Sequence, residues 1–258
     1  MQGLSVVLIS YNEEKNIRRC IRSVQGIADE IIVVDSFSDD DTVAIAISEG
    51  AIVKQSKFDD YINQKNKAIN MASHDLVLLL DADEAVSDEL AIAINEARKG
   101  LSYSAYSMSR CSFFCGRFIK RGLWYPDKKL RLFDKRLGHC GGMNPHDKII
   151  MDTDLPVKHL KGDILHYTFD TVEEYLERND AVSSIAAQSL YDAGIRKPWT
   201  KIVFSPLWAF INGYFLRLGF LDGYNGYIIA LYSSQQSFAK YQKLRRLHKQ
   251  EIKEVVWE

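Results

Sequence analysis

Carboxylate side chains follow three aliphatic segments of the sequence. Asp81 and Asp83, separated by Ala82, come directly after the run LVLLL; Glu13 follows LSVVLIS, and Asp35 ends EIIVVD. Because open parallel sheets bind ligands at the carboxyl ends of their strands, we expect these acids at one ligand-binding edge. Carboxylates gathered there repel one another, so the edge requires hydrogen-bond donors or a divalent cation, and a cation holding a diphosphate meets this need. For Asp35 alone, capping of the next helix explains the residue equally well.

The D-x-D pair is the sharper signal, because one small residue between two acids lets both leave the end of a strand. One carboxylate can reach a hard cation, and the other a ribose or a metal-bound water. The loop after the first strand, ISYNEEKN, has neither G-x-G-x-x-G nor G-K-[ST]. Dinucleotide dehydrogenases, P-loop NTPases and sugar-phosphate nucleotidyltransferases, which place glycine-rich loops there, are therefore disfavoured.

The segments that position these acids alternate between two patterns. Apolar runs at Leu4–Ser10, Glu30–Asp35 and Leu76–Leu80 are typical of parallel strands buried on both faces. Residues 13–26 and 38–50 between and after the first two have helical apolar spacing and end at a glycine. Strand and helix in alternation predict right-handed crossovers and an α/β fold with a mostly parallel sheet.

Size and charge narrow the class of protein. With 258 residues, 47% of them hydrophobic, the chain can bury one large core with an appended part. Its formal net charge of -1 provides no global basic field, which argues against a nucleic-acid partner. The first residues read as a strand and not as a leader peptide, so we expect a cytoplasmic protein. Its four scattered cysteines favour reduced, buried thiols over a disulfide framework or a zinc site.

The remainder of the chain shows two different sequence patterns. From about residue 100, aromatic and basic segments with glycine and proline predict antiparallel strands, which we assign to acceptor binding. From Thr171 the pattern is helical again, with Glu174 completing a capping box and Gly194 closing the helix. We therefore expect a nucleotide-sugar half at residues 1–100, an acceptor half at 101–170 and a helical tail at 171–258.

Two further side chains in the middle segment have two possible roles each. Arg131 alternates with Leu130 and Leu132, which points it to one side of a strand, where it could contact a diphosphate or be a surface charge. Trp124 could stack on a sugar of the acceptor or only pack.

The chain as a whole resembles family 2 inverting glycosyltransferases, which have the GT-A fold. The resemblance lies in SVVLISYNEEKNI, EIIVVDSFSDDDT and QKNKAINMASHDLVLLLDADE. It continues through LWYPDKKLRLF, NPHDKI, LHYTFDTVEEYLERN and FLRLGFLDGYNGYIIAL, and is nearest to the lipopolysaccharide-core β-1,4-glucosyltransferase subgroup.

That resemblance implies a role for each donor-site residue. Tyr11, Glu13 and Asp35 would hold the base and ribose of a nucleotide-sugar, and Lys65 would lie near the uracil or the phosphates. Asp81 would face the ribose, with Ala82 between it and Asp83. Asp83 and His166 would bind Mn2+ or Mg2+, although His166 could instead be a core histidine.

On the acceptor side, the resemblance implies Asp147 in NPHDKI as the general base. The subgroup more often has Glu at this position. Gly141 and Gly142 would form a loop that lets the acceptor approach. The implied reaction is a single in-line displacement that inverts the anomeric centre.

The last segment indicates a membrane contact. Residues 202–230 are rich in aromatic side chains but are interrupted by Asn212, Arg217 and Asp222, and the basic KYQKLRRLHK follows. This pattern favours a peripheral contact with the inner face of the cell membrane over a spanning helix, with a buried cap or a homodimer interface as alternatives.

We expect transfer of a hexose from a UDP-sugar to a glycan or lipid-linked acceptor. A polyprenyl-phosphate sugar transferase and a catalytically silent membrane-associated binding protein are the alternatives.

Overall fold

The computed structural model describes residues 1–100, 103–143, 146–196 and 199–255. The chain divides into two compact units: Met1–Cys111 with Asp127–Tyr167, and Ser112–Pro126 with Thr168–Glu258. The expected division near residue 170 is close to the boundary after Tyr167. The expected division after residue 100 is not a boundary between units, because the strands that follow complete the sheet of the first unit.

The first half of that sheet is parallel. Its strand order is β3-β2-β1-β4, and each neighbouring pair is parallel, as expected for strands joined by crossover connections. The strands are β1 (Leu4–Ser10), β2 (Glu30–Asp35), β3 (Ile52–Gln55) and β4 (Leu76–Asp81). The three strands predicted from the sequence are therefore confirmed. In the pairing register Ser10 lies opposite Asp35, and Ile9 lies opposite Asp81, so the carboxyl ends of β1, β2 and β4 are aligned.

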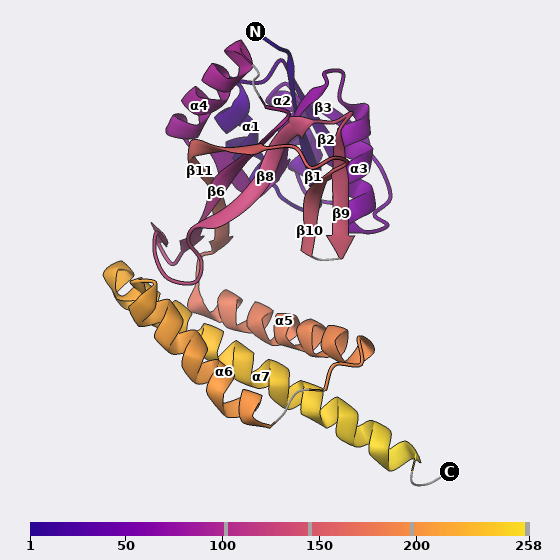
Figure 1. The fold of residues 1–258 in the computed structure, drawn as a ribbon. Coiled ribbons are helices and arrows are strands. Elements are labelled where there is room, and N and C mark those ends of the chain that lie inside the picture. The colour runs from indigo at the N-terminus through magenta and orange to yellow at the C-terminus, as the bar shows by residue number, and fades with distance from the viewer. Residues whose placement is uncertain (101–102, 144–145, 197–198, 256–258) are drawn as a thin grey trace. The chain divides into compact units, whose positions relative to one another are not determined.

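The second half of the sheet continues from β4 in the order β8-β6-β11-β5, with β7 beside β6. The strands are β5 (Glu84–Val86), β6 (Ala105–Phe114), β7 (Arg117–Phe118), β8 (Asp127–Asp134) and β11 (Val157–Phe169). Strand β8 runs antiparallel to β4 and β6, and β5 is antiparallel to β11. The sheet is thus mixed, with antiparallel strands where the aromatic and basic segments predicted them. A separate hairpin of β9 (Gly138–Met143) and β10 (His146–Met151) lies beside α3 (Figure 1).

Helices cover both faces of the parallel half. On one face pack α1 (Ile17–Val24), α2 (Thr42–Ser48) and α4 (Asp88–Lys99), and on the other α3 (Tyr61–Met71) with the hairpin. Val6 and Leu8 of β1 face the first layer, and Val7 between them faces the second. This alternation is why β1 has to be apolar throughout.

The second unit contains three helices that pack side by side: α5 (Val172–Asp192), α6 (Thr200–Ile211) and α7 (Gly223–Val255) (Figure 1). A π-helical turn (Asn212–Leu216) and a 3-10 turn (Gly219–Asp222) connect α6 to α7. The predicted capping box is present, with Thr171 accepting from the backbone N–H of Glu174. Gly194 follows α5 at a φ of 65°, as expected for a glycine that ends a helix.

The core of this unit is aromatic and includes a segment that precedes the helices by some fifty residues of sequence. Phe114 and Ile119 pack against Tyr175 of α5 and against Ile228 and Ile229 of α7. In the described part of the chain, no helix combines the length and the apolar run needed to cross a membrane.

Candidate active site

The carboxyl ends of β1, β2 and β4 bring the predicted acids together. Burial raises the pKa of Glu13, as do the nearby carboxylates of Asp83, Asp40 and Asp81, although a hydrogen bond from Asn16 opposes the rise. The carboxylate of Glu13 therefore lies within the field of the D-x-D pair. Among the described residues, Glu13 forms no ion pair with Lys or Arg, so the repulsion predicted from the sequence is present at this edge.

Asp35 is fully buried and its carboxylate is occupied within the protein. It accepts hydrogen bonds from Ser10 Oγ at 3.0 Å, from Ser38 N at 2.9 Å and from Ser38 Oγ. Ser38 Oγ in turn accepts from the backbone N–H of Asn12 at 2.9 Å, and Asn12 has a φ of 53°. Asp35 thus fixes the loops after β1 and β2, while the neighbouring Tyr11 is 60% exposed.

Lys65 on α3 is the centre of the charge arrangement. Its Nζ lies 2.8 Å from Asp81 Oδ1 and 2.9 Å from Asp147 Oδ2, and only 3% of the residue is exposed. Burial lowers the pKa of Lys65, but the two carboxylates outweigh burial and the repulsion of Arg131, so its pKa is raised. Lys65 is therefore a fixed cation that joins β4 to β10.

Asn66 and Cys140 hold the hairpin against α3 at this point. The Asn66 side chain donates to Cys140 O at 2.8 Å and accepts from Cys140 N at 2.9 Å. Burial and the adjacent Asp147 raise the pKa of the Cys140 thiol to about 12. The thiol is therefore protonated at neutral pH, and its Sγ lies 3.7 Å from Asp147 Oδ2. Sequence reasoning missed Asn66, although it lies beside Lys65 in the motif QKNKA.

The second oxygen of Asp81 is held by Arg131 of β8, whose guanidinium lies 2.9 Å from Asp81 Oδ2 and 3.5 Å from Glu84 Oε1. Burial alone would raise the pKa of Asp81, but Arg131 and Lys65 hold it well below its usual range. Arg131 is itself 6% exposed, so it is placed to fix Asp81 and not as a surface charge. Glu84 is 1% exposed, and it also accepts from Asp81 N at 3.0 Å.

Arg110 extends this arrangement outward. It contacts Glu84 at 3.4 Å and Asp127 at 2.8 Å. Acids and bases therefore alternate from β10 to β8 in the order Asp147, Lys65, Asp81, Arg131, Glu84, Arg110 and Asp127. Glu84 and Arg110 were not predicted. The position of Glu84 directly after the D-x-D pair was a usable signal, whereas Arg110 comes from a strand that no local pattern connects to the site.

Asp83 and His166 form the other pair of the site. Asp83 Oδ2 lies 3.2 Å from His166 Nε2, and both side chains are partly buried. Strand β11 brings them together, because His166 pairs with Glu84 in the β5–β11 ladder and Tyr167 N donates to Asp83 O at 2.9 Å. Among the described residues, His166 is the only ion-pair partner of Asp83. The two acids of the motif thus have different surroundings.

The remaining predicted residues are placed as follows. Ala82 is buried between the two acids, at 4% exposure. Gly141 and Gly142 lie in strand β9 and not in a loop, so that expectation was wrong in its local structure. Gly142 lies opposite Asp147 at a φ of 105°, a backbone conformation that favours glycine, whereas a Cβ on Gly141 would come within 2.7 Å of Ile150 Cδ1, the movable end of a side chain. Trp124 belongs to the second unit.

The sheet thus has a parallel half whose strands end in acids and an antiparallel half that carries His166. Residues 5–152 match the family model described as glycosyl transferase family 2. The chain belongs to this family and is a glycosyltransferase.

Similar proteins cover most of the chain. It is 30% identical to an uncharacterized glycosyltransferase of Rickettsia typhi, over 96% of this chain and 88% of that protein. It is 24% identical to the lipopolysaccharide core biosynthesis glycosyltransferase LpsC of Rhizobium meliloti, over 95% of this chain and 93% of that protein. The crystal structure of glucosyl-3-phosphoglycerate synthase from Mycobacterium tuberculosis with phosphoglyceric acid covers 76% of this chain and 81% of its own, at 18% identity and a TM-score of 0.49.

The Lys65 contacts lead to a stability prediction. Lys65→Met leaves the carboxylates of Asp81 and Asp147 without their shared cation, so we expect a loss of about 3–5 kcal/mol in the free energy of unfolding. Lys67→Met is a matched control, because Lys67 lies on the same helix, is partly exposed and pairs with Asp59; it should cost less than about 1 kcal/mol. Urea denaturation measures both, and equal losses would mean that the buried ammonium does not hold the site.

Proposed function

We propose that the protein is an inverting transferase that moves a hexose from a UDP-sugar to a saccharide of the lipopolysaccharide core or to another glycan or lipid-linked acceptor. The observation that carries this proposal is the contrast within the D-x-D motif. Asp81 is held on both oxygens by cations of the protein, whereas Asp83 pairs with no Lys or Arg among the described residues and lies beside the imidazole of His166. The Rhizobium meliloti relative, a lipopolysaccharide core biosynthesis glycosyltransferase, supports the class of acceptor.

A divalent metal fits the second acid of the motif. Two ligands about 2.0–2.2 Å from an ion and at right angles to each other are separated by about 3 Å. Asp83 Oδ2 and His166 Nε2 are 3.2 Å apart. No group of three or more metal-binding side chains occurs among the described residues, so the donor diphosphate and water would complete the coordination. When bound, Mn2+ or Mg2+ would neutralise charge on the diphosphate as it leaves.

The nucleotide would lie along the ends of β1 and β2. The exposed ring of Tyr11 is available to the base, and Asp35 keeps the loop under it in one conformation through Ser38. Asp81, fixed by Lys65 and Arg131, faces the ribose in this arrangement, and Glu13 lies beside it. Rigid donors and acceptors of this kind cost no reorganisation when the ligand binds.

Asp147 is proposed as the general base. Its Oδ2 accepts from Lys65, which fixes the orientation of the carboxylate, and no partner of Oδ1 occurs among the described residues. Oδ1 would take the proton of the acceptor hydroxyl as that oxygen forms a bond to the anomeric carbon. The bond from this carbon to the diphosphate oxygen breaks at the same time, and its electron pair leaves with the diphosphate. Attack from the opposite side inverts the anomeric configuration.

A membrane surface is the proposed location, at the inner face of the cell membrane. Helix α6 has no buried residue, and Val203, Phe204, Leu207 and Trp208 along it are each more than half exposed. The turns that follow expose further large apolar side chains, among them Phe215, Leu216 and Leu221. Tryptophan and phenylalanine on one side of a helix suit the boundary of a bilayer, and Arg217 is exposed beside them to meet anionic headgroups.

The metal assignment predicts that Asp83→Ala abolishes the dependence of UDP binding on Mn2+. The parent should bind UDP at least about tenfold more tightly with Mn2+ than without it, and the variant should bind UDP weakly under both conditions. Isothermal titration calorimetry measures the affinities, with Asp154→Ala, an exposed acid, as the control. Tight Mn2+-dependent binding by the Asp83→Ala variant would contradict the assignment.

The base assignment predicts a separation of binding and rate. Asp147→Asn keeps an oxygen that can accept from Lys65 but removes the basic site, so donor affinity should be nearly unchanged while transfer falls about a hundredfold or more. UDP-sugar affinity and the initial rate of transfer to a core oligosaccharide should be measured on one preparation. A collapse of donor affinity would move Asp147 to the phosphate site. A parental rate would remove it from the reaction and leave Asp127 or Asp163 to be tested.

The membrane proposal predicts that the double change Phe204→Ser and Trp208→Ser releases the protein from vesicles of phosphatidylglycerol and phosphatidylcholine. Serine removes the apolar area that enters the bilayer boundary. Ile185→Ser is the matched control, because Ile185 is an exposed apolar residue of α5. Cosedimentation measures the bound fraction. If the double variant sediments like the parent, the membrane contact lies elsewhere. A parental dimer that becomes a monomer in the double variant would show a homodimer interface instead.

A further inference from the structure

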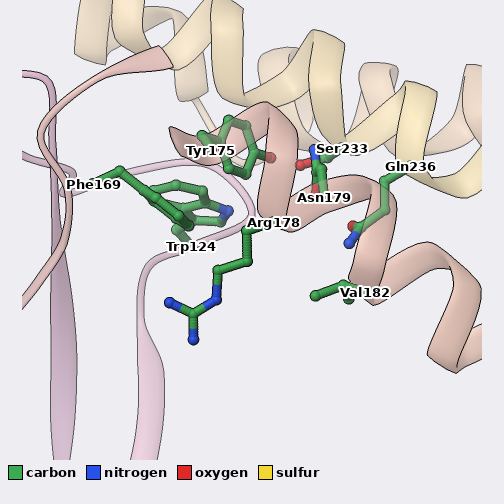
Figure 2. A pocket seen from close by; sticks show the side chains of 8 residues that line it. All are labelled: Trp124, Phe169, Tyr175, Arg178, Asn179, Val182, Ser233 and Gln236. Atoms are coloured by element: carbon green, nitrogen blue, oxygen red, sulfur yellow. The ribbon is translucent and has the colours of Figure 1, made fainter. Parts of the chain in front are cut away.

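The second unit contains a small pocket between α5, α7 and the segment around Trp124 (Figure 2). Its volume is about 180 Å3, below the roughly 300 Å3 at which ligand pockets of ordinary size begin. It is therefore large enough for one small ring and not for an extended ligand. All of the residues that line it belong to this unit.

One side of the pocket is aromatic. The rings of Trp124 and Phe169 have centroids 6.1 Å apart and are inclined by 38°, and both residues are partly exposed. The ring of Tyr175 meets Trp124 edge-on at 5.3 Å and is 5% exposed, so it supports the indole from behind. A supported and partly exposed aromatic face is a platform for the C–H face of a sugar ring.

The other sides are polar. The hydroxyl of Tyr175 is hydrogen-bonded to the side chains of Ser233 and Asn179, which places a bonded polar group at the base of the pocket. Gln236 lies one helical turn after Ser233 on α7, and its amide offers both donors and an acceptor. Hydroxyl groups of a sugar need partners of this kind.

Arg178 gives the pocket its charge. Its guanidinium lies 5.8 Å from the centroid of the Phe169 ring, and Figure 2 shows the side chain extending between Trp124 and Val182. Arg178 is exposed and forms no ion pair within the described part of the chain, and none of the described residues that line the pocket is acidic. A guanidinium that lies near a ring and has no acidic partner keeps its donors free for a carboxylate or a phosphate.

We propose that this pocket binds one ring of an anionic saccharide, with the ring against Trp124 and its carboxylate or phosphate on Arg178. This inference deepens the proposed function by naming a charged sugar as part of the acceptor, and it rests on that function only for its role in the reaction. The binding itself requires neither donor nor metal.

Saturation-transfer NMR on the full chain tests the proposal with methyl β-D-glucuronide, glucose 6-phosphate and the neutral methyl β-D-glucoside. The parent should bind an anionic probe at least about tenfold more tightly than the glucoside. Arg178→Ala should remove this preference, and Arg178→Lys should keep part of it, because a point charge replaces the planar fork. Gln236→Ala should weaken all three probes. Arg245→Ala, at an exposed arginine of α7 outside the pocket, should behave like the parent.

The two anionic probes decide whether the site prefers a carboxylate or a phosphate. Equal affinity of the parent for charged and neutral probes, a preference that survives Arg178→Ala, or no binding of any probe would overturn the proposal. Measuring UDP and Mn2+ binding on the same preparations distinguishes a failure of the saccharide pocket from a failure of the proposed donor site. Intact UDP binding without probe binding overturns this inference alone. Arginine-dependent probe binding without UDP binding supports this inference and contradicts the donor site.

Discussion

The ammonium of Lys65, buried between Asp81 and Asp147, is the interaction on which the arrangement at the carboxyl end of the parallel strands depends. It joins three elements that are distant in sequence: helix α3, the end of β4 and the hairpin strand β10. Two carboxylates held near each other in a poorly hydrated place repel unless a cation lies between them. Lys65 is the cation whose ion pairs, at 2.8 and 2.9 Å, connect the hairpin strand that carries Asp147 to the strand end that carries Asp81. Asn66 adds neutral hydrogen bonds to the same junction.

Acidic and basic side chains alternate outward from this junction. As a result, Asp81 and Asp83 differ in how far the protein balances their negative charge. Asp81 accepts from Lys65 and Arg131, so its charge is already balanced by the protein. Asp83, two residues later, lies against β11, where its side-chain partner among the described residues is the imidazole of His166. A charge that the protein does not balance is the one that a bound cation can balance. In the proposed function both acids face the donor, Asp81 as a carboxylate fixed by the protein and Asp83 as a carboxylate whose charge is left for a bound cation.

Local patterns were sufficient to predict the elements around the site. The apolar runs of β1, β2 and β4, the stripe of α1 and the capping box at Thr171 depend on residues close together in sequence, and the structure confirms them. Which acid pairs with which base could not be predicted in this way. Lys65 and Asp147 are separated by 82 positions, and no periodicity relates them. The family resemblance named both residues but did not indicate that they touch.

Two expectations differ from the structure: the loop at Gly141 and Gly142, and the boundary after residue 100. Two adjacent glycines usually indicate a loop, but both lie within a paired strand, where Gly142 has a positive φ that favours glycine. Likewise, residues 112–126 read as part of the acceptor half, yet Phe114 and Ile119 bury their side chains against α5 and α7. For residues 112–126 the decisive contacts are made by segments far away in sequence, which local composition does not record.

Charged side chains of the second unit also differ in whether the protein balances them. In the first unit the unbalanced side chain is an acid, and in the second it is a base. There, buried Asp222 accepts from the backbone of Lys120 at 3.1 Å and pairs with Arg117, so these charges serve the connection between segments. Lys243 of α7 is engaged with Asp180 and neighbouring hydroxyls of α5, and so it also holds the helices together. Arg178 differs from both, because its charge has an aromatic ring beside it and no acid among the described residues. An arginine that contributes to no ion pair adds little to the fold, and its charge is available to a ligand. The first unit thus presents unbalanced acids that suit a metal-bound diphosphate, and the second presents an unbalanced base beside rings and amides, which suits an acidic sugar.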